Sequence, residues 1–395
     1  MNGIAYLAWR HTHFHWLRSL TLVLVMATLI TIPLLAEVLT RAAETRMMSR
    51  AEATPLIYGS AGAPLDLTLT AAYFRGDIET PISMEDYDWL IASRLADLAP
   101  VHVAGTSRSI PIIGTDFEYF RLRGLTAAAG RLPVSLGEVV LGAEAAQSLG
   151  VAAGELVTSD VNQVFDLAGA YPVGMLISGI LEPTGTPDDG AILTDLKTGW
   201  IVSGLGHGHE ELTRQTKAAL LLKGAGGDAI TANASLPTLE TISADQLADF
   251  HFHGPSETFP LSAVLVFPFD EKSSALLRGR VEARDTAVQI LRPTDQIRGL
   301  MENVFQVKSV LQGVMLAVSL AALLAMALVV WLSVQMRRRE FDVALRLGAG
   351  PGLPAALVAS ELLLLLTAAV IISLAVTWSA ALMEDQIAQL WFRNG

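Results

Sequence analysis

Three long runs that are almost free of charged residues constrain this chain more than any other feature. Leu20–Ala36 and Ser309–Met336 contain no charged residue, and Leu353–Met383 contains one, Glu361. An α-helix needs roughly 20 apolar residues to cross a bilayer, and each run is about that length or longer. The sequence therefore predicts an integral membrane protein whose α-helical spans lie at about 17–36, 308–336 and 353–382.

The composition agrees with that prediction. The chain is 52% hydrophobic and only 17% charged, whereas soluble proteins are about a quarter charged. This composition argues against a disordered chain, and the net charge of −12 argues against a basic nucleic-acid-binding protein. The absence of cysteine excludes a disulfide scaffold but does not indicate a compartment.

The distribution of charge predicts how the chain is oriented in a bacterial inner membrane. The N-terminus (1–16) carries Arg10, and Arg18 follows it closely, while the loop 337–352 has four arginines and two acids. The segment Glu37–Lys308 has 34 acids and 20 lysines and arginines. By the positive-inside rule the N-terminus and the loop are cytoplasmic. We expect 37–307 to be periplasmic and the tail 383–395 to be external.

Two features of the spans leave alternatives open. Residues 1–36 also resemble a secretory signal peptide, but no clean cleavage site precedes Glu37, so we expect a retained anchor. One side of the second span is rich in small residues, which let helices approach closely in lipid. Dimerisation through that side and a simple abundance of alanine are both consistent with this pattern. The small residues are Gly313, Ala317, Ser319, Ala321, Ala322, Ala325 and Ala327.

The long external segment alternates between patterns typical of strands and of helices, which predicts a large α+β domain. Strands are expected at Leu65–Phe74, Val101–Ala104, Ser109–Ile113, Glu138–Leu141, Met175–Leu181, Ala218–Leu222 and Ala263–Phe267. Helices are expected at Met84–Leu98, at Ala143–Leu149 before Gly150, and over the run from Arg284 into Ser309.

Motifs for catalysis are absent from the sequence. Lys197, Lys272 and Lys308 are followed by Ser or Thr, but none has the preceding glycine of a Walker A motif. GxSxG, HExxH and CxxC patterns are also missing. We therefore predict no catalytic residues in this chain, and any ATP hydrolysis is expected in a separate subunit.

The cytoplasmic loop is the sharpest local feature. Its segment Arg337–Arg346 predicts a short amphipathic helix that ends at Gly348–Pro351. Phe341, Ala344, Leu345 and Gly348 share one helical face. Such a helix, tied between two spans, could dock another protein, and the alternative is a positive-inside anchor with an incidental helical turn.

The loop sequence RRREFDVALRLGA is similar to the stretch after the second span in MacB/FtsX-type permeases of ABC transporters. The external segment carries a second resemblance to this family's periplasmic core domain. Its matching segments follow in the family's order: Gly114–Phe120, Gly130–Pro133, Gly137–Gly142 and Gly179–Asp189. Each match is weak alone, and the ordered set covers nearly the whole chain.

This resemblance implies a type VII permease, which works by mechanotransmission. ATP binding to two copies of a separate ABC ATPase would move the spans, and the motion would reach the periplasmic domain. The implied domain has a membrane-proximal part, at about 51–125 and 260–293, and an inserted part, at about 126–259. On the loop, the coupling residues that seat in the ATPase would be Arg339, Glu340, Leu345, Arg346 and Gly348, with Phe341 on the same helix.

The resemblance also implies partners and one departure. Expected partners are a second permease copy or a paralogue, a periplasmic adaptor or binding protein, and membrane lipids, but no nucleic acid. Members of the family have four spans, whereas this sequence predicts three and ends in a segment, Met383–Phe392, that could lie at the membrane surface. A partner could supply the fourth helix, this branch could lack it, or the chain could be truncated.

Two sets of polar residues are further candidates. His207 and His209, with His251 and His253, could form a periplasmic zinc site if the fold brings the pairs together, because imidazole is a common zinc ligand. The alternative is polar loop decoration without metal. Glu361 lies inside the third span, where an acid is a functional candidate by default, although a structural hydrogen bond to a neighbouring helix or loop is the simpler interpretation.

Three functions are consistent with these observations. The first is a permease subunit that moves or extracts a substrate on the periplasmic side. The second uses the same machine to regulate a periplasmic cell-wall enzyme. The third is a membrane-anchored metal-binding or assembly protein without ATPase coupling. The coupling loop separates the third function from the other two.

Overall fold

The computed structural model describes residues 3–76, 78–160, 172–208, 221–223, 230–232, 240–242, 250–252, 254–284 and 287–382. The chain forms two compact units, one of residues 1–47 with 299–395 and the other of residues 48–298. The tail 383–395, and with it the predicted surface segment, lies outside the described residues.

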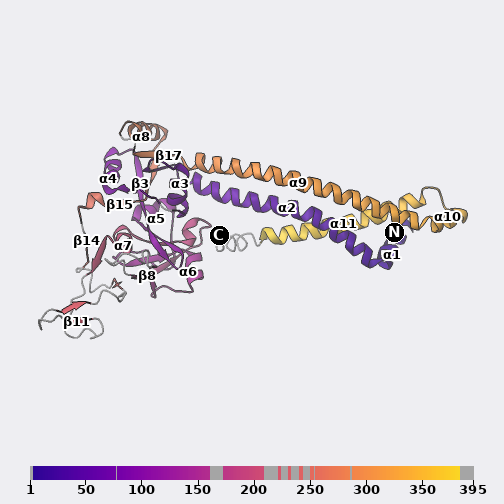
Figure 1. The fold of residues 1–395 in the computed structure, drawn as a ribbon, viewed down its shortest axis with the longest axis horizontal. Coiled ribbons are helices and arrows are strands. Elements are labelled where there is room, and N and C mark those ends of the chain that lie inside the picture. The colour runs from indigo at the N-terminus through magenta and orange to yellow at the C-terminus, as the bar shows by residue number, and fades with distance from the viewer. Residues whose placement is uncertain are drawn as a thin grey trace. The chain divides into compact units, whose positions relative to one another are not determined.

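The unit of residues 48–298 is built on one mixed sheet (Figure 1). Among the described residues its main strand order is β13-β8-β6-β9-β4-β3-β16-β1-β17, with β5 and β7 also paired to β8. The parallel pairs β4–β9, β6–β8 and β13–β8 lie among antiparallel ones. The strands are β1 (Leu56–Ser60), β3 (Ala96–Ser107), β4 (Ile110–Thr115), β5 (Ala127–Gly130), β6 (Glu138–Leu141), β7 (Leu156–Thr158), β8 (Val173–Leu181), β9 (Ile192–Asp195), β13 (Glu240–Thr241), β16 (Ala263–Pro268) and β17 (Val288–Leu291).

Three small two-stranded ribbons accompany this sheet. They pair β2 (Ile82–Ser83) with β15 (Pro260–Leu261), β10 (Gly206–Gly208) with β14 (Phe250–Phe252), and β11 (Leu221–Lys223) with β12 (Ile230–Ala232). The predicted strand Ala218–Leu222 overlaps β11 only at its end, because 218–220 lie outside the described residues.

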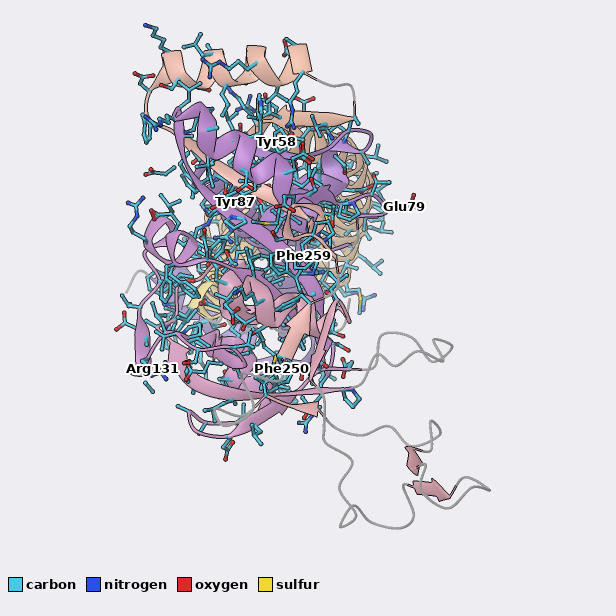
Figure 2. The ribbon with its side chains drawn as sticks, turned by 90° about the vertical axis from the view of Figure 1, so that its left-hand side faces the viewer. Tyr58, Glu79, Tyr87, Arg131, Phe250 and Phe259 are labelled. Atoms are coloured by element: carbon cyan, nitrogen blue, oxygen red, sulfur yellow. The ribbon has the colours of Figure 1, made fainter. Side chains whose placement is uncertain are left out.

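Helices cover the sheet and bury its apolar residues. They are α3 (Pro64–Tyr73), α4 (Met84–Ser93), α5 (Phe117–Arg123), α6 (Ala143–Leu149), α7 (Leu196–Val202) and α8 (Glu271–Arg284), with 3-10 turns η1 (Pro187–Gly190) and η4 (Ser256–Thr258). In Figure 2, α8 lies at one end of the unit, against β17, and the labelled Arg131 and Phe250 lie at the other. The largest core cluster includes Ile57, Val101 and Leu193, which are all fully buried.

Most predicted elements of this unit are present in the structure. β6 and α6 have the predicted bounds, and the strands expected at Val101–Ala104, Met175–Leu181 and Ala263–Phe267 lie within β3, β8 and β16. The helix predicted from Met84 is correct for its first ten residues. It ends at Arg94, which adopts a left-handed conformation, so that Leu98 belongs to β3 instead.

Two predictions were wrong. Leu65–Phe74 is a helix, α3, and not a strand. Pro64 occupies its first turn, where the missing N–H costs nothing, and Leu67 and Ala71 are buried on one side at helical spacing. The run from Arg284 to Ser309 is not one helix either. β17 pairs with β1 within it, and a new helix begins at Pro293.

The other unit is helical. Its elements are α1 (Gly3–Phe14), most of α2 (Trp16–Glu52), the later part of α9 (Pro293–Met336), α10 (Arg338–Arg346) and α11 (Leu353–Leu382). Among the described residues, three helices are long and apolar enough to cross a membrane: α2, the part Gln312–Met336 of α9, and α11. These agree with the three predicted spans. α2 and α9 each continue without a break from one unit into the other.

Small side chains allow α2 and α11 to pack closely. Ala27 and Ala369 are buried together with Val23 and Leu365, and the Ser373 hydroxyl donates a hydrogen bond to the Ala27 carbonyl oxygen at 3.1 Å. Close backbone approach through small residues is typical of helices that associate in lipid. By contrast, among the described side chains of the apolar window in Gln312–Met336, none is buried within this chain. Its small-residue side remains a predicted dimerisation surface.

Candidate functional site

The helix α10 follows directly from the loop sequence. The chain leaves α9 at Met336, turns at Arg337 and begins the short helix Arg338–Arg346. Gly348 then adopts a positive φ of 97°, a conformation that suits glycine and stops the helix. The predicted amphipathic helix between two membrane-capable helices is therefore present.

On the predicted apolar face of α10, Leu345 is 38% exposed whereas Phe341 is not. Phe341 is buried, with the Arg337 guanidinium 5.0 Å from its ring centre, so Phe341 anchors the helix to its own unit. Val343 is 56% exposed and Leu347 is 83% exposed, and the two residues lie one turn apart on the same side of the helix. Arg339 and Arg346 are also exposed. The surface available for docking thus joins Val343 and Leu347 to two arginines. We call these four residues the α10 face.

Glu361 is the centre of a polar cluster in the helical unit. The Arg337 guanidinium donates to its Oε1 at 3.0 Å, and His11 Nδ1 lies 3.0 Å from the same oxygen. Only 7% of Glu361 is exposed. Burial of a carboxylate costs free energy unless the group is paired and hydrogen-bonded. The Glu361 carboxylate is contacted by both Arg337 and His11. The cluster joins α1, the start of α10 and α11.

His11 is neutral at physiological pH in this cluster. Burial lowers the pKa of its imidazole and the Arg337 charge lowers it further, while the Glu361 charge raises it by less than these effects together. A neutral His11 can still donate its Nδ1 proton to Glu361. His11 and Glu361 belong to separate helices, α1 and α11. No sequence pattern indicated their contact, because the two residues are 350 positions apart.

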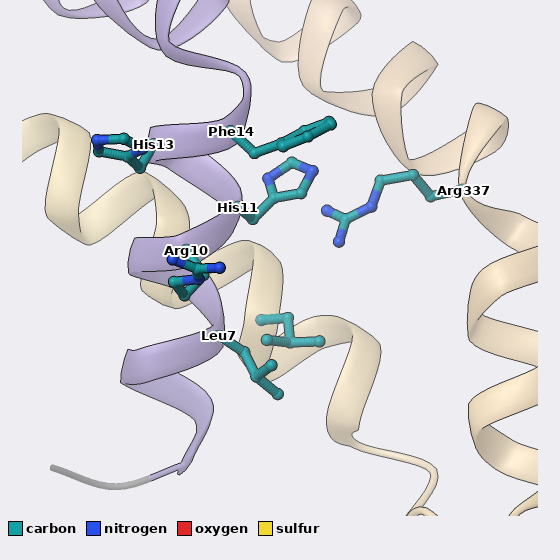
Figure 3. A pocket seen from close by; sticks show the side chains of 7 residues that line it. Leu7, Arg10, His11, His13, Phe14 and Arg337 are labelled. Atoms are coloured by element: carbon teal, nitrogen blue, oxygen red, sulfur yellow. The ribbon is translucent and has the colours of Figure 1, made fainter.

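A pocket opens beside this cluster (Figure 3). In the view, the Arg337 side chain extends from its own helix towards the His11 ring. The pocket is lined by Leu7, Arg10, His11, His13, Phe14, Arg337 and Leu357. Arg10 and Arg337 give it a basic character. It belongs to the same junction of helices as Glu361.

Replacing Glu361 by glutamine should loosen this junction. Glutamine keeps the size of the side chain but leaves Arg337 without its charged partner, so we expect the free energy of unfolding to fall by about 1.5–3 kcal/mol. Thermal unfolding of the purified chain in detergent, followed by circular dichroism, measures the change. Ser360→Ala is the matched control, because the Ser360 hydroxyl bonds only within its own helix, to the Leu357 carbonyl. Equal melting temperatures for Glu361→Gln and wild type would contradict the prediction.

The unit of residues 48–298 contains a second, more deeply buried ionic site. Arg50, in the last turns of α2, donates from Nη1 to Asp188 Oδ2 at 2.7 Å and from Nη2 to Asp188 Oδ1 at 3.0 Å. Its Nε donates to the Ala72 carbonyl oxygen at 2.9 Å. The Tyr119 hydroxyl donates to Asp188 Oδ1 at 2.5 Å. Arg50 and Asp188 are 3% and 1% exposed. We call this network the Arg50–Asp188 lock.

The loop that carries Asp188 is held in a defined shape. Asp189, the next residue, accepts hydrogen bonds from the backbone N–H groups of Thr184 and Gly185. Gly142 lies directly against the loop, because a Cβ at that position would be 2.1 Å from the Asp188 carbonyl oxygen. In the sequence, Gly179–Asp189 stood out only as a segment that matches the family. The sequence near Asp188 did not indicate its bidentate partner, because Arg50 is 138 positions away.

The charges in the lock stabilise one another. Burial alone would raise the pKa of the Asp188 carboxyl, but the Arg50 charge and the Tyr119 hydroxyl hold that pKa below its ordinary value. Asp188 is therefore ionised at neutral pH. Arg123 adds to the junction by donating to the Thr54 hydroxyl at 2.6 Å, just beyond the end of α2. These bonds attach the end of α2 to the loop that carries Asp188.

The four histidines of the predicted metal site are only partly described. His209 and His253 lie outside the described residues. His207 and His251 are direct partners in the antiparallel β10–β14 ribbon. Among the described residues, no cluster holds three or more potential metal ligands. Zinc binding therefore remains a proposal.

Comparison with known proteins settles the family. The family model described as the MacB-like periplasmic core domain matches residues 17–239, which is more than half of the 395-residue chain. The chain belongs to the MacB-like periplasmic core domain family. This result confirms the resemblance to MacB/FtsX-type permeases. The chain thus combines a MacB-like periplasmic core domain with three apolar helices that are able to span a membrane.

Other comparisons add little to the family match. The periplasmic region of MacB from Actinobacillus actinomycetemcomitans overlaps the structure with a TM-score of 0.34 and 10% sequence identity, over 63% of this chain and 93% of that one. At that score the likeness is loose, and the family assignment rests on the family match. No curated protein matches the chain.

Proposed function

We propose that this MacB-family chain is the permease subunit of an ABC complex in the bacterial inner membrane. Its periplasmic domain is driven by a separate ATPase that docks on the cytoplasmic α10 face. The observation that carries the proposal is the α10 face itself. Val343 and Leu347 are exposed there together with Arg339 and Arg346, while Phe341 fixes the helix to its own unit.

The chemistry of the α10 face suits a protein partner better than open solvent. Apolar side chains in the centre with arginine at the edge are typical of protein interfaces. The four arginines of 337–352 and the positive-inside rule favour a cytoplasmic position, which is where an ATPase meets its nucleotide. The chain lacks a Walker A motif, so the nucleotide would be bound by the partner.

The Arg50–Asp188 lock supports the second half of the proposal, the transmission of motion to the periplasmic domain. α2 contains one of the membrane-capable segments and ends in a turn whose arginine is buried in the α/β unit. A movement of α2 along or across its axis would therefore act on the loop that holds Asp188. Substrate would be moved or extracted on the periplasmic side, by a dimer of this chain or by this chain with a paralogue.

The docking half of the proposal is tested by reversing charges on the coupling helix. We expect Glu340→Lys combined with Arg346→Glu to abolish co-purification of ATP-hydrolysing activity with the tagged chain from its native membranes. The reason is that opposite charges placed at an interface repel the partner that wild type attracts. Arg278→Glu with Glu282→Lys on α8, in the other unit, is the matched control. Unchanged ATPase recovery with the α10 double variant would contradict the docking assignment.

A further inference from the structure

The pocket beside Glu361 lies where the three membrane-capable helices begin or end. Arg10 and Phe14 line it from α1, which leads directly into α2. Arg337 follows the last residue of α9, and Leu357 lies about 6 Å along α11 from its first residue, at a rise of 1.5 Å per residue. The lining thus gathers at one end of the apolar segments, which is the level of the lipid headgroups when the segments cross a bilayer.

The exposed aromatic residues of the N-terminal segment suit that level. Four aromatic side chains on α1 and at the start of α2 are more than half exposed: Tyr6, Trp9, Phe14 and Trp16. Tryptophan and tyrosine concentrate at membrane–water interfaces, because their rings are apolar while their N–H and O–H groups remain hydrated. Ala8 is fully buried, so α1 also packs against its own unit. We infer that α1 lies in the headgroup layer.

The pocket contains one arginine whose charge is not balanced by a carboxylate of the described residues. The Arg337 guanidinium is paired with Glu361 at 3.0 Å. Arg10 lines the same pocket and is exposed, and within the described part of the chain no carboxylate is paired with it. Burial lowers the pKa of His11, and the charge of Arg18 contributes to this lowering, so a further positive charge acts on the junction. The pocket therefore favours an anion.

The size and lining of the pocket suit a phosphate group that carries apolar chains. Its volume of about 440 Å³ lies within the range of about 300–1,000 Å³ that is typical of small-molecule sites. Leu7, Phe14 and Leu357 provide apolar surface, while Arg10 and His13 provide N–H donors. A guanidinium group binds phosphate oxygens through two parallel hydrogen bonds. Figure 3 shows Arg10, His11 and Phe14 together on α1.

We propose that this pocket binds the phosphate headgroup of an anionic phospholipid from the cytoplasmic leaflet, with Arg10 as its principal ligand. The inference rests on the proposed function, which puts this end of the helices at the cytoplasmic surface of the inner membrane. Basic pockets between helices at that surface bind anionic headgroups. The bound lipid joins α1 to the segment that begins α10. A free phosphate ester has the same headgroup chemistry but lacks the acyl chains that the apolar helices contact.

The test is the lipid preference of the full chain, purified in detergent without any ATPase. Native mass spectrometry measures the lipids retained from an equimolar mixture of phosphatidylglycerol and phosphatidylcholine. We expect wild type to prefer phosphatidylglycerol at least fivefold. Arg10→Gln should weaken phosphatidylglycerol binding about fivefold, which corresponds to about 1 kcal/mol per arginine near an anionic lipid. Arg10→Lys should retain part of the preference, because it keeps the charge but loses the paired hydrogen bonds.

The control variant is Arg338→Gln. It removes the same charge from an exposed residue next to Arg337 that does not line the pocket, so it should keep the wild-type preference. Equal retention of the two lipids by wild type, or equal losses in Arg338→Gln and Arg10→Gln, would overturn the proposed site. Glycerol 3-phosphate at the concentration of the lipid should not displace it, and displacement would assign the pocket to a soluble phosphate ester instead. Because no ATPase is present, a failure of ATPase docking leaves these results unchanged.

Discussion

Asp188→Asn is expected to lower the free energy of unfolding of the periplasmic unit by about 3–5 kcal/mol, because it leaves the buried Arg50 charge without its partner. Arg50 is only 3% exposed, so water cannot replace the lost carboxylate. Asparagine has nearly the same shape, and packing around Tyr119 is therefore retained. Urea unfolding of the full chain in detergent, followed by the fluorescence of its tryptophans, which include Trp89 and Trp200 in this unit, measures the change.

The control for this prediction is an arginine with similar partners at the surface. Arg121 pairs with Glu118 at 2.6 Å and with Asp97 at 2.8 Å, but its side chain is 57% exposed. Arg121→Met should cost less than about 1 kcal/mol, because exposed ion pairs contribute little. A double variant, Arg50→Met with Asp188→Leu, should recover much of the loss caused by either single change. Equal costs for Asp188→Asn and Arg121→Met would show that the lock does not hold the helix end.

The same pair predicts how stability depends on pH. The pKa of Asp188 is depressed in the folded protein, so its contribution is fully present above the ordinary aspartate pKa of about 3.9. The contribution is lost as the pH falls through the lower, folded-state pKa. The acid limb of the stability curve should therefore be shallower in Asp188→Asn than in wild type.

Val343→Asp combined with Leu347→Asp is expected to reduce the recovery of ATPase with the chain at least a hundredfold. Each substitution would carry an unpaired charge into the centre of the α10 face, where burial of a charge costs several kcal/mol. About 2.7 kcal/mol already corresponds to a hundredfold change in a binding constant. ATP hydrolysis that co-purifies with the tagged chain, normalised to the amount of chain, measures the effect.

The matched control places the same charges on exposed apolar residues elsewhere. Ile91 is 50% exposed and Val134 is 64% exposed, both in the periplasmic unit. Ile91→Asp with Val134→Asp should leave ATPase recovery at the wild-type level. Both double variants should elute as wild type does in gel filtration. Full ATPase recovery with the α10 variant would assign docking to another surface.

Together these tests separate two steps of the proposed machine. The α10 variants remove the partner while leaving the Arg50–Asp188 lock intact. Asp188→Asn leaves the docking surface intact and weakens the attachment of α2 to the periplasmic domain. If the Asp188→Asn complex keeps its ATPase activity but no longer moves substrate on the periplasmic side, the Arg50–Asp188 lock acts after ATPase docking and before substrate movement.

The elements that the sequence predicted well carry strong local signals. Gly150 adopts the left-handed conformation that ends α6 at its predicted residue, and the charge-free runs match the three apolar helices. The prediction of a strand at Leu65–Phe74 was wrong because Leu65, Leu67 and Leu69 alternate as in a strand. In the structure, Pro64 in the first turn and the burial of Ala71 against the core favour the helix α3 instead. β17 was missed because its pairing with β1 depends on a strand more than 200 residues earlier.

The sequence by itself determined that this chain has three apolar helices, a large α/β unit between the first two of them and a charged amphipathic helix before the third. Those features depend on composition and spacing over short distances. Only the tertiary structure decided that Phe341 is buried while Val343 and Leu347 are exposed, that His11 and Arg337 pair with Glu361, and that Arg50 meets Asp188. These contacts join residues from separate elements, and a buried charge finds its partner in space rather than along the chain.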